Sequence, residues 1–177
     1  MRVIAGEFRS RRLKSVPGLA TRPTPDRLRE TLFDVLGPKI QGATFLDVYA
    51  GTGAVGIEAL SRGARRCIFV EKNRAAAAVI RDNLVALGLE NRAEVYTSKA
   101  GPVLERVSAD IVFLDPPYEL DKEYDAALGL LGAKPGPQLV IAQHESRRSL
   151  PEQAGALGRY RVLKQGNNSL SFYSTPA

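Results

Sequence analysis

The sequence predicts an α/β fold: a mostly parallel, seven-stranded sheet with helices on both faces and an antiparallel hairpin at its C-terminal end. From Thr44 onward, short β-rich apolar runs alternate with segments of helical periodicity, a rhythm typical of a parallel sheet. A glycine-rich turn joins the first of these runs to the helical segment after it. Near the C-terminus, two β-rich segments flank Gly166-Asn167-Asn168, which indicates a hairpin. A chain of 177 residues fits a single domain on size alone.

The region before the sheet is expected to contain a basic arm and one helix. Residues 1–20 mix basic and apolar side chains in a way that favours a small hairpin or arm. We expect a helix over 24–37, with Thr24 as its N-cap and Pro25 as its first residue. One face of that helix is apolar and is formed by Leu28, Leu32, Val35 and Leu36.

The sheet and its helices are expected over residues 43–177. The parallel strands are predicted at 44–48, 66–71, 93–97, 109–114 and 137–143. The helices between and after them are predicted at 54–62, 74–87, 100–107 and 121–131. The closing hairpin is predicted from strands at 160–164 and 169–173. In such a sheet, ligands bind at the edge where the strands have their carboxyl ends.

Composition is that of a globular chain, with 44% hydrophobic and 25% charged residues. No apolar run is long enough to span a membrane, and Met1-Arg2-Val3-Ile4 is too short for a signal sequence, so we expect a cytoplasmic protein. The single cysteine, Cys67, excludes an internal disulfide and a cysteine-based metal cluster. Its apolar neighbours favour a buried position in a strand.

The positive charge is concentrated near the N-terminus. The net charge is +6, and residues 1–30 hold eight basic side chains against three acidic ones. Such a concentration favours a surface that binds a phosphate-rich polyanion, although a solvated basic face is the simpler alternative.

The turn Asp115-Pro116-Pro117-Tyr118 follows the predicted strand 109–114 directly. The two prolines make the turn rigid and keep their carbonyl oxygens as acceptors. The turn therefore offers the Asp115 carboxylate, the Pro116 carbonyl and the Tyr118 ring to a planar group that carries hydrogen-bond donors, such as the exocyclic amine of a nucleobase. A stiff turn without chemistry is the alternative reading.

The glycine-rich turn is compatible with a nucleotide-like cofactor. Gly51, Gly53 and Gly56 match G-x-G-x-x-G, and Glu71 follows 20 residues after Gly51, as in dinucleotide-binding folds. Asp47 makes a pyrophosphate-containing cofactor unfavourable, because the negative Asp47 carboxylate would lie beside the negative pyrophosphate. S-adenosylmethionine has a cationic ammonium group, a ribose for Glu71 and no phosphate. Alternatively, Asp47 caps the loop.

Together these motifs resemble the class I S-adenosylmethionine-dependent amino-methyltransferases, which have a Rossmann-like fold. More narrowly, the chain is similar to the RsmD family, which methylates the N2 amine of a guanine in 16S ribosomal RNA. The resemblance is carried by Asp47-x-x-Ala50-Gly51-x-Gly53, Glu71, Asp115-Pro116-Pro117-Tyr118, the opening Arg2-Val3-Ile4-Ala5-Gly6-x-x-Arg9, the helix Arg22–Phe33 and the closing Gly166–Tyr173 segment.

The resemblance implies roles for particular residues, with residues 43–177 as the catalytic core. It implies a catalytic turn of Asp115, Pro116, Pro117 and Tyr118, into which the base is flipped. It implies that S-adenosyl-L-methionine is bound by Thr24, Asp47, Tyr49, Gly51, Thr52, Gly53, Glu71, Lys72, Ser98, Lys99 and Ala100. It implies that RNA is bound by Arg2, Arg9, Arg11, Arg12, Lys14, Arg22 and Arg27. The expected partner is 16S ribosomal RNA or the assembling small ribosomal subunit, with a monomeric enzyme and neither metal nor membrane.

One position departs from the family pattern. The third strand is followed by Ser98-Lys99-Ala100, where related enzymes often have an Asp or Asn for the adenine amine. A lysine side chain cannot accept a hydrogen bond, so the adenine contact is expected from a backbone carbonyl or Ser98.

Two other functions remain open. Guanine presents N1–H and N2–H side by side, which suits one carboxylate, whereas an adenine-N6 methyltransferase of DNA or RNA is the alternative. The short spacing from Glu71 to Asp115 leaves no room for a DNA-recognition insert, which favours RNA. A NAD-dependent oxidoreductase is the more distant alternative. The single histidine, His144, is expected at a strand end in a structural role.

Overall fold

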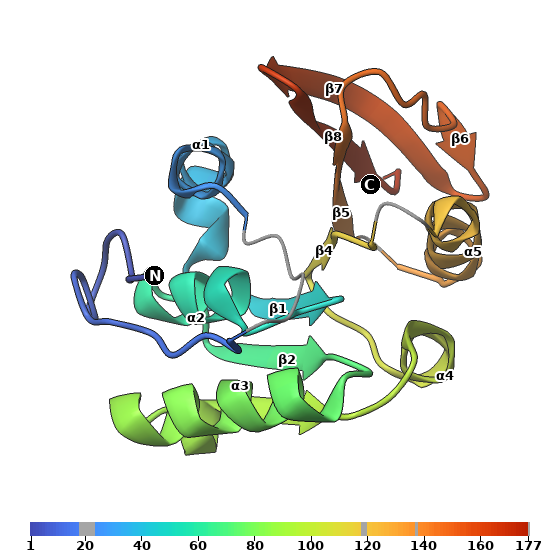
Figure 1. Cartoon of the computed structure of the whole chain (residues 1–177). Coiled ribbons are helices and arrows are strands. Elements are labelled where there is room, and N and C mark those ends of the chain that lie inside the picture. The colour runs from blue at the N-terminus through green and yellow to red at the C-terminus, as the bar shows by residue number, and fades with distance from the viewer. Residues whose placement is uncertain (18–23, 118–119, 137, 177) are drawn as a thin grey trace.

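The computed structural model describes residues 1–17, 24–117, 120–136 and 138–176. Among these residues, eight strands form one sheet in the order β3-β2-β1-β4-β5-β8-β7-β6 (Figure 1). Strands β1 to β5 are parallel to one another, and the remaining pairs are antiparallel. The strands are β1 (Thr44–Val48), β2 (Arg66–Val70), β3 (Ala93–Tyr96), β4 (Ile111–Leu114), β5 (Leu139–Glu145), β6 (Gln153–Ala154), β7 (Leu157–Gln165) and β8 (Asn168–Ser174).

The predicted α/β class and the C-terminal antiparallel hairpin are confirmed, but the predicted number of seven strands is wrong. The additional strand, β6, has only two residues and pairs with the first two residues of β7. A strand this short has no periodicity that a sequence pattern could reveal.

Helices cover both faces of the sheet. They are α1 (Asp26–Leu36), α2 (Ala54–Ser61), α3 (Arg74–Leu87), α4 (Ala100–Arg106) and α5 (Asp121–Gly132), with short 3-10 turns η1 (Gly37–Ile40) and η2 (Glu90–Arg92). Alternate strand residues face opposite sides, so Phe45 packs in the cluster with α1, α2 and α3, whereas Leu46 packs in the cluster with α4 and α5. Within the described residues, no helix is long and apolar enough to cross a membrane.

Helix α1 begins later than predicted. Pro25 has an extended ψ of 141° and is the residue that precedes the helix, which starts at Asp26. Thr24 is therefore not the N-cap, and no side chain caps this helix. The Thr24 hydroxyl instead donates to Oδ2 of Asp115 at 3.5 Å, which brings the start of α1 to the predicted catalytic turn.

The N-terminal segment, residues 1–14, lies against the helices of the first cluster. Its ends form an antiparallel bridge between Arg2 and Arg12. The buried Glu58 carboxylate on α2 accepts from the backbone N–H groups of Ile4 and Ala5, at 2.9 and 3.0 Å. A carboxylate with no exposed surface that accepts from two main-chain donors is a strong anchor, so this segment has a defined position on the core.

Candidate active site

Three carboxylates converge at the carboxyl ends of neighbouring strands. Asp47 lies near the end of β1, Glu71 follows β2 and Asp115 follows β4. Burial raises the pKa of Asp47 well above its usual value, and the negative charges of Asp115 and Glu71 raise this pKa further. The charges of Asp115 and Glu71 make the site acidic within a protein of net charge +6, and it suits a cationic ligand better than a phosphate.

The glycine-rich loop borders this acidic site. Gly51 has a φ of +60°, and a Cβ built there would meet no atom within 4 Å. Glycine is thus required by the backbone conformation, and the space beside the loop is open to a ligand. Gly56 is required for a different reason, since a Cβ there would lie 2.3 Å from the ring of Phe69. This close approach of α2 to the sheet is the packing role of the third glycine in such loops.

Asp47 fixes the position of the glycine-rich loop through a hydrogen bond. Its Oδ2 accepts from the backbone N–H of Gly56 at 2.9 Å, and the side chain is 2% exposed. The contact observed in the structure is thus the loop-capping one.

Glu71 is held in a fixed orientation next to the loop. Its Oε1 accepts from the Gly51 N–H at 2.8 Å and its Oε2 from the Asn73 N–H at 2.7 Å. The side chain is half-buried, and each oxygen keeps a further lone pair. This pair of acceptor oxygens fits two neighbouring hydroxyls of a ribose. Lys72 follows directly and is exposed.

Tyr49 and Thr52 connect the loop to other elements. Tyr49 has a φ of +62°, which is uncommon and costly for a bulky side chain, and its hydroxyl donates to Oε2 of Glu123 on α5 at 2.7 Å. The Thr52 carbonyl accepts from Nδ2 of Asn83 on α3 at 3.4 Å. Sequence analysis did not find Glu123 or Asn83, because no local pattern links them to a loop many residues away.

The residues after β3 lie beside Glu71. The Ser98 N–H donates to the Glu71 carbonyl at 3.2 Å, and the Ser98 hydroxyl donates to the Lys99 carbonyl at 2.9 Å. Lys99 is exposed, whereas Ala100 is buried at the start of α4. The Ser98 oxygen therefore keeps only its acceptor lone pairs.

The structure describes part of the predicted catalytic turn. Asp115 is half-buried, Pro116 is buried and Pro117 is exposed, while Tyr118 lies outside the described residues. The buried Tyr124 of α5 donates its hydroxyl to the Gln143 carbonyl at 2.6 Å. Burial, and to a smaller extent the negative charge of Asp115, raises the pKa of Tyr124.

The predicted RNA-binding residues divide into two groups. Arg2, Arg9, Arg12 and Arg27 are exposed and are the cations most available to a polyanion. Two others are engaged: Arg11 donates to the Ala86 carbonyl at 3.2 Å, and Lys14 lies 3.8 Å from Asp82. Arg22 lies outside the described residues.

Two further residue classes were considered for chemistry. Among residues that the structure describes, no group of three or more His, Cys, Asp or Glu side chains is arranged to hold a metal ion. His144 is buried at the end of β5 and hydrogen-bonds the Ser171 hydroxyl at 2.7 Å. Its other ring nitrogen contacts the Glu145 carbonyl, so the two ring nitrogens contact residues of β5 and β8. These contacts are consistent with the expected structural role.

Comparison with known proteins places the chain among similar sequences along its whole length. The family model described as "Conserved hypothetical protein 95" matches residues 1–174. The chain is 42% identical over 181 residues to the Escherichia coli K12 protein named ribosomal RNA small subunit methyltransferase D, covering 100% of this chain and 91% of that protein.

Solved structures agree in fold. The yhhF protein of Escherichia coli superposes with a TM-score of 0.88 at 32% identity, covering 100% of this chain and 98% of that one. A hypothetical protein of Thermus thermophilus superposes with a TM-score of 0.81 at 30% identity, covering 97% and 98% of the two chains.

Proposed function

The chain belongs to the family described as conserved hypothetical protein 95, the RsmD family, and we propose that it methylates the exocyclic N2 amine of one guanine in 16S ribosomal RNA with S-adenosyl-L-methionine. The observation that carries the proposal is the convergence of Asp47, Glu71 and Asp115 beside an open glycine loop. The name of the Escherichia coli relative, a ribosomal RNA small subunit methyltransferase, supports the substrate class.

The acidic loop site supports the choice of cofactor. S-adenosylmethionine supplies an electrophilic methyl group on a positively charged sulfur. Glu71, already oriented by two backbone donors, would accept from the ribose hydroxyls. Gly51 and Gly53 would let the backbone approach the amino-acid portion of the cofactor, with Asp47 fixing the loop beneath them. Ser98 and the backbone beside it would meet the adenine ring.

Asp115 and Pro116 would bind the base that is methylated. The lone pair of a guanine N2 amine is delocalised into the ring, so the amine is a poor nucleophile. Hydrogen bonds from that amine to the Asp115 carboxylate and the Pro116 carbonyl would direct the lone pair toward the methyl group. As positive charge develops on the nitrogen, Asp115 would stabilise it and accept the proton. Stacking on Tyr118 would hold the base in place, as the sequence motif suggests.

The exposed cations near the N-terminus would contact the RNA backbone. These cations are Arg2, Arg9, Arg12 and Arg27, whose side chains are exposed. Phosphate contacts position an RNA without reading its sequence. We place the enzyme in the cytoplasm, where the small ribosomal subunit assembles.

The test is the identity of the methylated nucleoside. Small ribosomal subunits and naked 16S RNA from a strain that lacks this protein are incubated with methyl-labelled S-adenosylmethionine and digested to nucleosides. We expect label in N2-methylguanosine, mapped to one nucleotide. Label in N6-methyladenosine, or none in either RNA, would contradict the proposal. Stabilisation of the protein by NAD rather than by S-adenosylhomocysteine in a melting experiment would favour an oxidoreductase.

A further inference from the structure

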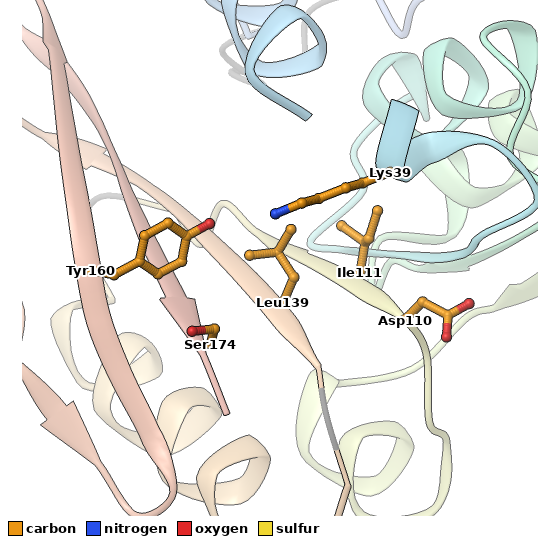
Figure 2. A pocket seen from close by; sticks show the side chains of 6 residues that line it. All are labelled: Lys39, Asp110, Ile111, Leu139, Tyr160 and Ser174. Atoms are coloured by element: carbon orange, nitrogen blue, oxygen red, sulfur yellow. The ribbon is translucent and has the colours of Figure 1, made fainter. Parts of the chain in front are cut away.

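A pocket lies at the opposite edge of the sheet from the acidic site. It has a volume of about 420 Å³ and is lined by Lys39, Asp110, Ile111, Leu139, Tyr160 and Ser174 (Figure 2). Ile111 and Leu139 are the first residues of β4 and β5, whereas Asp115 follows the last residue of β4. At ~3.3 Å per strand residue, the length of β4 separates the two sites by roughly 13 Å. A ligand in this pocket is therefore not at the methylation site.

The pocket has an exposed aromatic wall. Tyr160 on β7 is 52% exposed, and its ring centroid lies 6.2 Å from that of the buried Phe172. Figure 2 shows the Lys39 amine directed from η1 toward the Tyr160 hydroxyl, across the apolar side chains of Leu139 and Ile111. An open aromatic face beside an apolar floor suits a flat ring, and stacking of this kind is how proteins hold unpaired bases.

Unpaired cations lie around this wall. Lys39 and Arg161 are exposed, and within the described ranges no acidic side chain lies within ion-pair distance of either of them. Arg159 differs, since its guanidinium lies 3.9 Å from Glu152. The Arg161 guanidinium lies 5.9 Å from the centroid of the Phe172 ring, on the same aromatic cluster as Tyr160. These charges complement phosphate groups.

Strand β7 also leaves its outer side open next to the pocket. Strand β6 pairs only with Leu157 and Gly158, so in the described part of the chain the rest of β7 has a strand neighbour, β8, on one side alone. The pairing with β8 shifts register between Arg159 and Arg161, at the position of Tyr160. Such a bulge redirects side chains at a sheet edge.

We propose that this pocket and the exposed cations of β7 form a second RNA-docking site, which holds one unpaired nucleotide of the same ribosomal RNA. The base would stack on Tyr160 over Leu139, and its phosphates would contact Lys39 and Arg161. Oδ2 of Asp110 already accepts from the Thr44 N–H at 2.8 Å, and its other oxygen can accept from a base amine or a ribose hydroxyl. A carboxylate in the lining favours a nucleotide over inorganic phosphate. The inference rests on the proposed function, because it assumes an RNA substrate.

The experiment compares RNA binding by four variants. Tyr160→Ala should weaken binding of 16S RNA about five-fold or more at fixed salt, without changing the salt slope, whereas Tyr160→Phe should bind as the wild type does. Lys39→Gln with Arg161→Gln should lower the salt slope of binding by roughly 1.4 to 1.8, for two lost phosphate contacts. Arg106 is exposed on α4 at the other side of the sheet, so Arg106→Gln is a control for the loss of one surface cation and should leave binding unchanged.

Two further readouts separate this site from the active site. The methylated nucleotide, the rate at saturating RNA and the affinity for S-adenosylhomocysteine should be those of the wild type in every variant. If the wild type methylates RNA and the Tyr160 and Lys39/Arg161 variants bind it with wild-type affinity and salt slope, this inference is overturned and the proposed function stands. A wild-type protein that does not bind 16S RNA would overturn both.

Discussion

At the residue scale, the Glu71 carboxylate accepts from the Gly51 N–H of the glycine-rich loop and, in the proposed function, also binds the ribose of the cofactor. Replacing Glu71 with alanine should weaken binding of S-adenosylhomocysteine by roughly 1.5–3 kcal/mol, since ribose hydroxyls would lose a charged acceptor. Isothermal calorimetry measures this directly. Glu90→Ala, an exposed acid of η2, is the control and should bind normally. An unchanged affinity in Glu71→Ala would mean that the ribose lies elsewhere.

His144 gives a pH dependence whose sign follows from burial. Its Nδ1 faces the Glu145 carbonyl at 2.8 Å, and because a carbonyl can only accept, the neutral ring carries its proton there. Burial lowers the pKa of His144 below its ordinary value of 6.5. The unfolded chain therefore binds the proton more readily, and the free energy of unfolding should fall as the pH drops below about 6.5.

Urea unfolding at a series of pH values from about 7.5 to 5 tests this expectation. The His144→Gln variant should lose this part of the pH dependence, because it removes the only histidine of the chain. Parallel pH curves for variant and wild type would contradict the assignment.

The sequence predicted those site residues that local pattern determines. Asp47, Glu71 and Asp115 are each acids at or directly after a short apolar run, so their place at the carboxyl edge of a sheet follows from the α/β fold. Glu123 and Asn83 could not be found, because their partners Tyr49 and Thr52 lie far away in sequence. The Thr24 N-cap was wrong, since a Thr-Pro pair does not distinguish proline before the helix from proline within it.

At the scale of elements, the N-terminal segment depends on one glycine. Gly6 has a φ of +89°, and a Cβ there would lie 2.1 Å from the Ser61 carbonyl oxygen of α2. Gly6→Ala should therefore displace the segment and lower the free energy of unfolding. Gly42→Ala is the matched control, because Gly42 has a φ of +72° but no atom within 4 Å of its Cβ position. The control should cost only the ~1–2 kcal/mol of a left-handed conformation.

Hydrogen exchange locates the effect within the segment. The backbone N–H groups of Ile4 and Ala5 donate hydrogen bonds to Glu58. In Gly6→Ala these two N–H groups should exchange faster than in the wild type. Equal stability losses in the two glycine variants would mean that close packing against Ser61 does not anchor this segment.

Sequence patterns predict the helices and strands of this fold, but they do not predict how the N-terminal segment packs on them. The βα alternation predicted each parallel strand and the helices between them to within a few residues, because strands buried on both faces read as short continuous apolar runs. Docking of residues 1–14 had no such signal. Glu58 resembles any surface glutamate of a helix, yet it is fully buried beneath the backbone of that segment. Side chains that satisfy distant main-chain groups are visible only in three dimensions.

At the scale of the whole molecule, acidic and basic side chains are concentrated in different places. The edge where β1, β2 and β4 end is acidic, whereas exposed cations occupy the N-terminal segment and β7. A positive outer surface would attract RNA, and an acidic interior site would accept a cationic cofactor and a base that donates hydrogen bonds. The two requirements oppose each other, and distance within the fold keeps them compatible.

Methyl transfer by Asp115→Ala tests the central claim most directly. Single-turnover transfer to 16S RNA should fall by about 10²–10³, because the carboxylate meets the charge that develops on the amine. Binding of S-adenosylhomocysteine should stay within a few-fold, and Asp125→Ala, an exposed acid of α5, should transfer at the wild-type rate. An Asp115→Ala protein that keeps more than about a tenth of the wild-type rate would contradict the account.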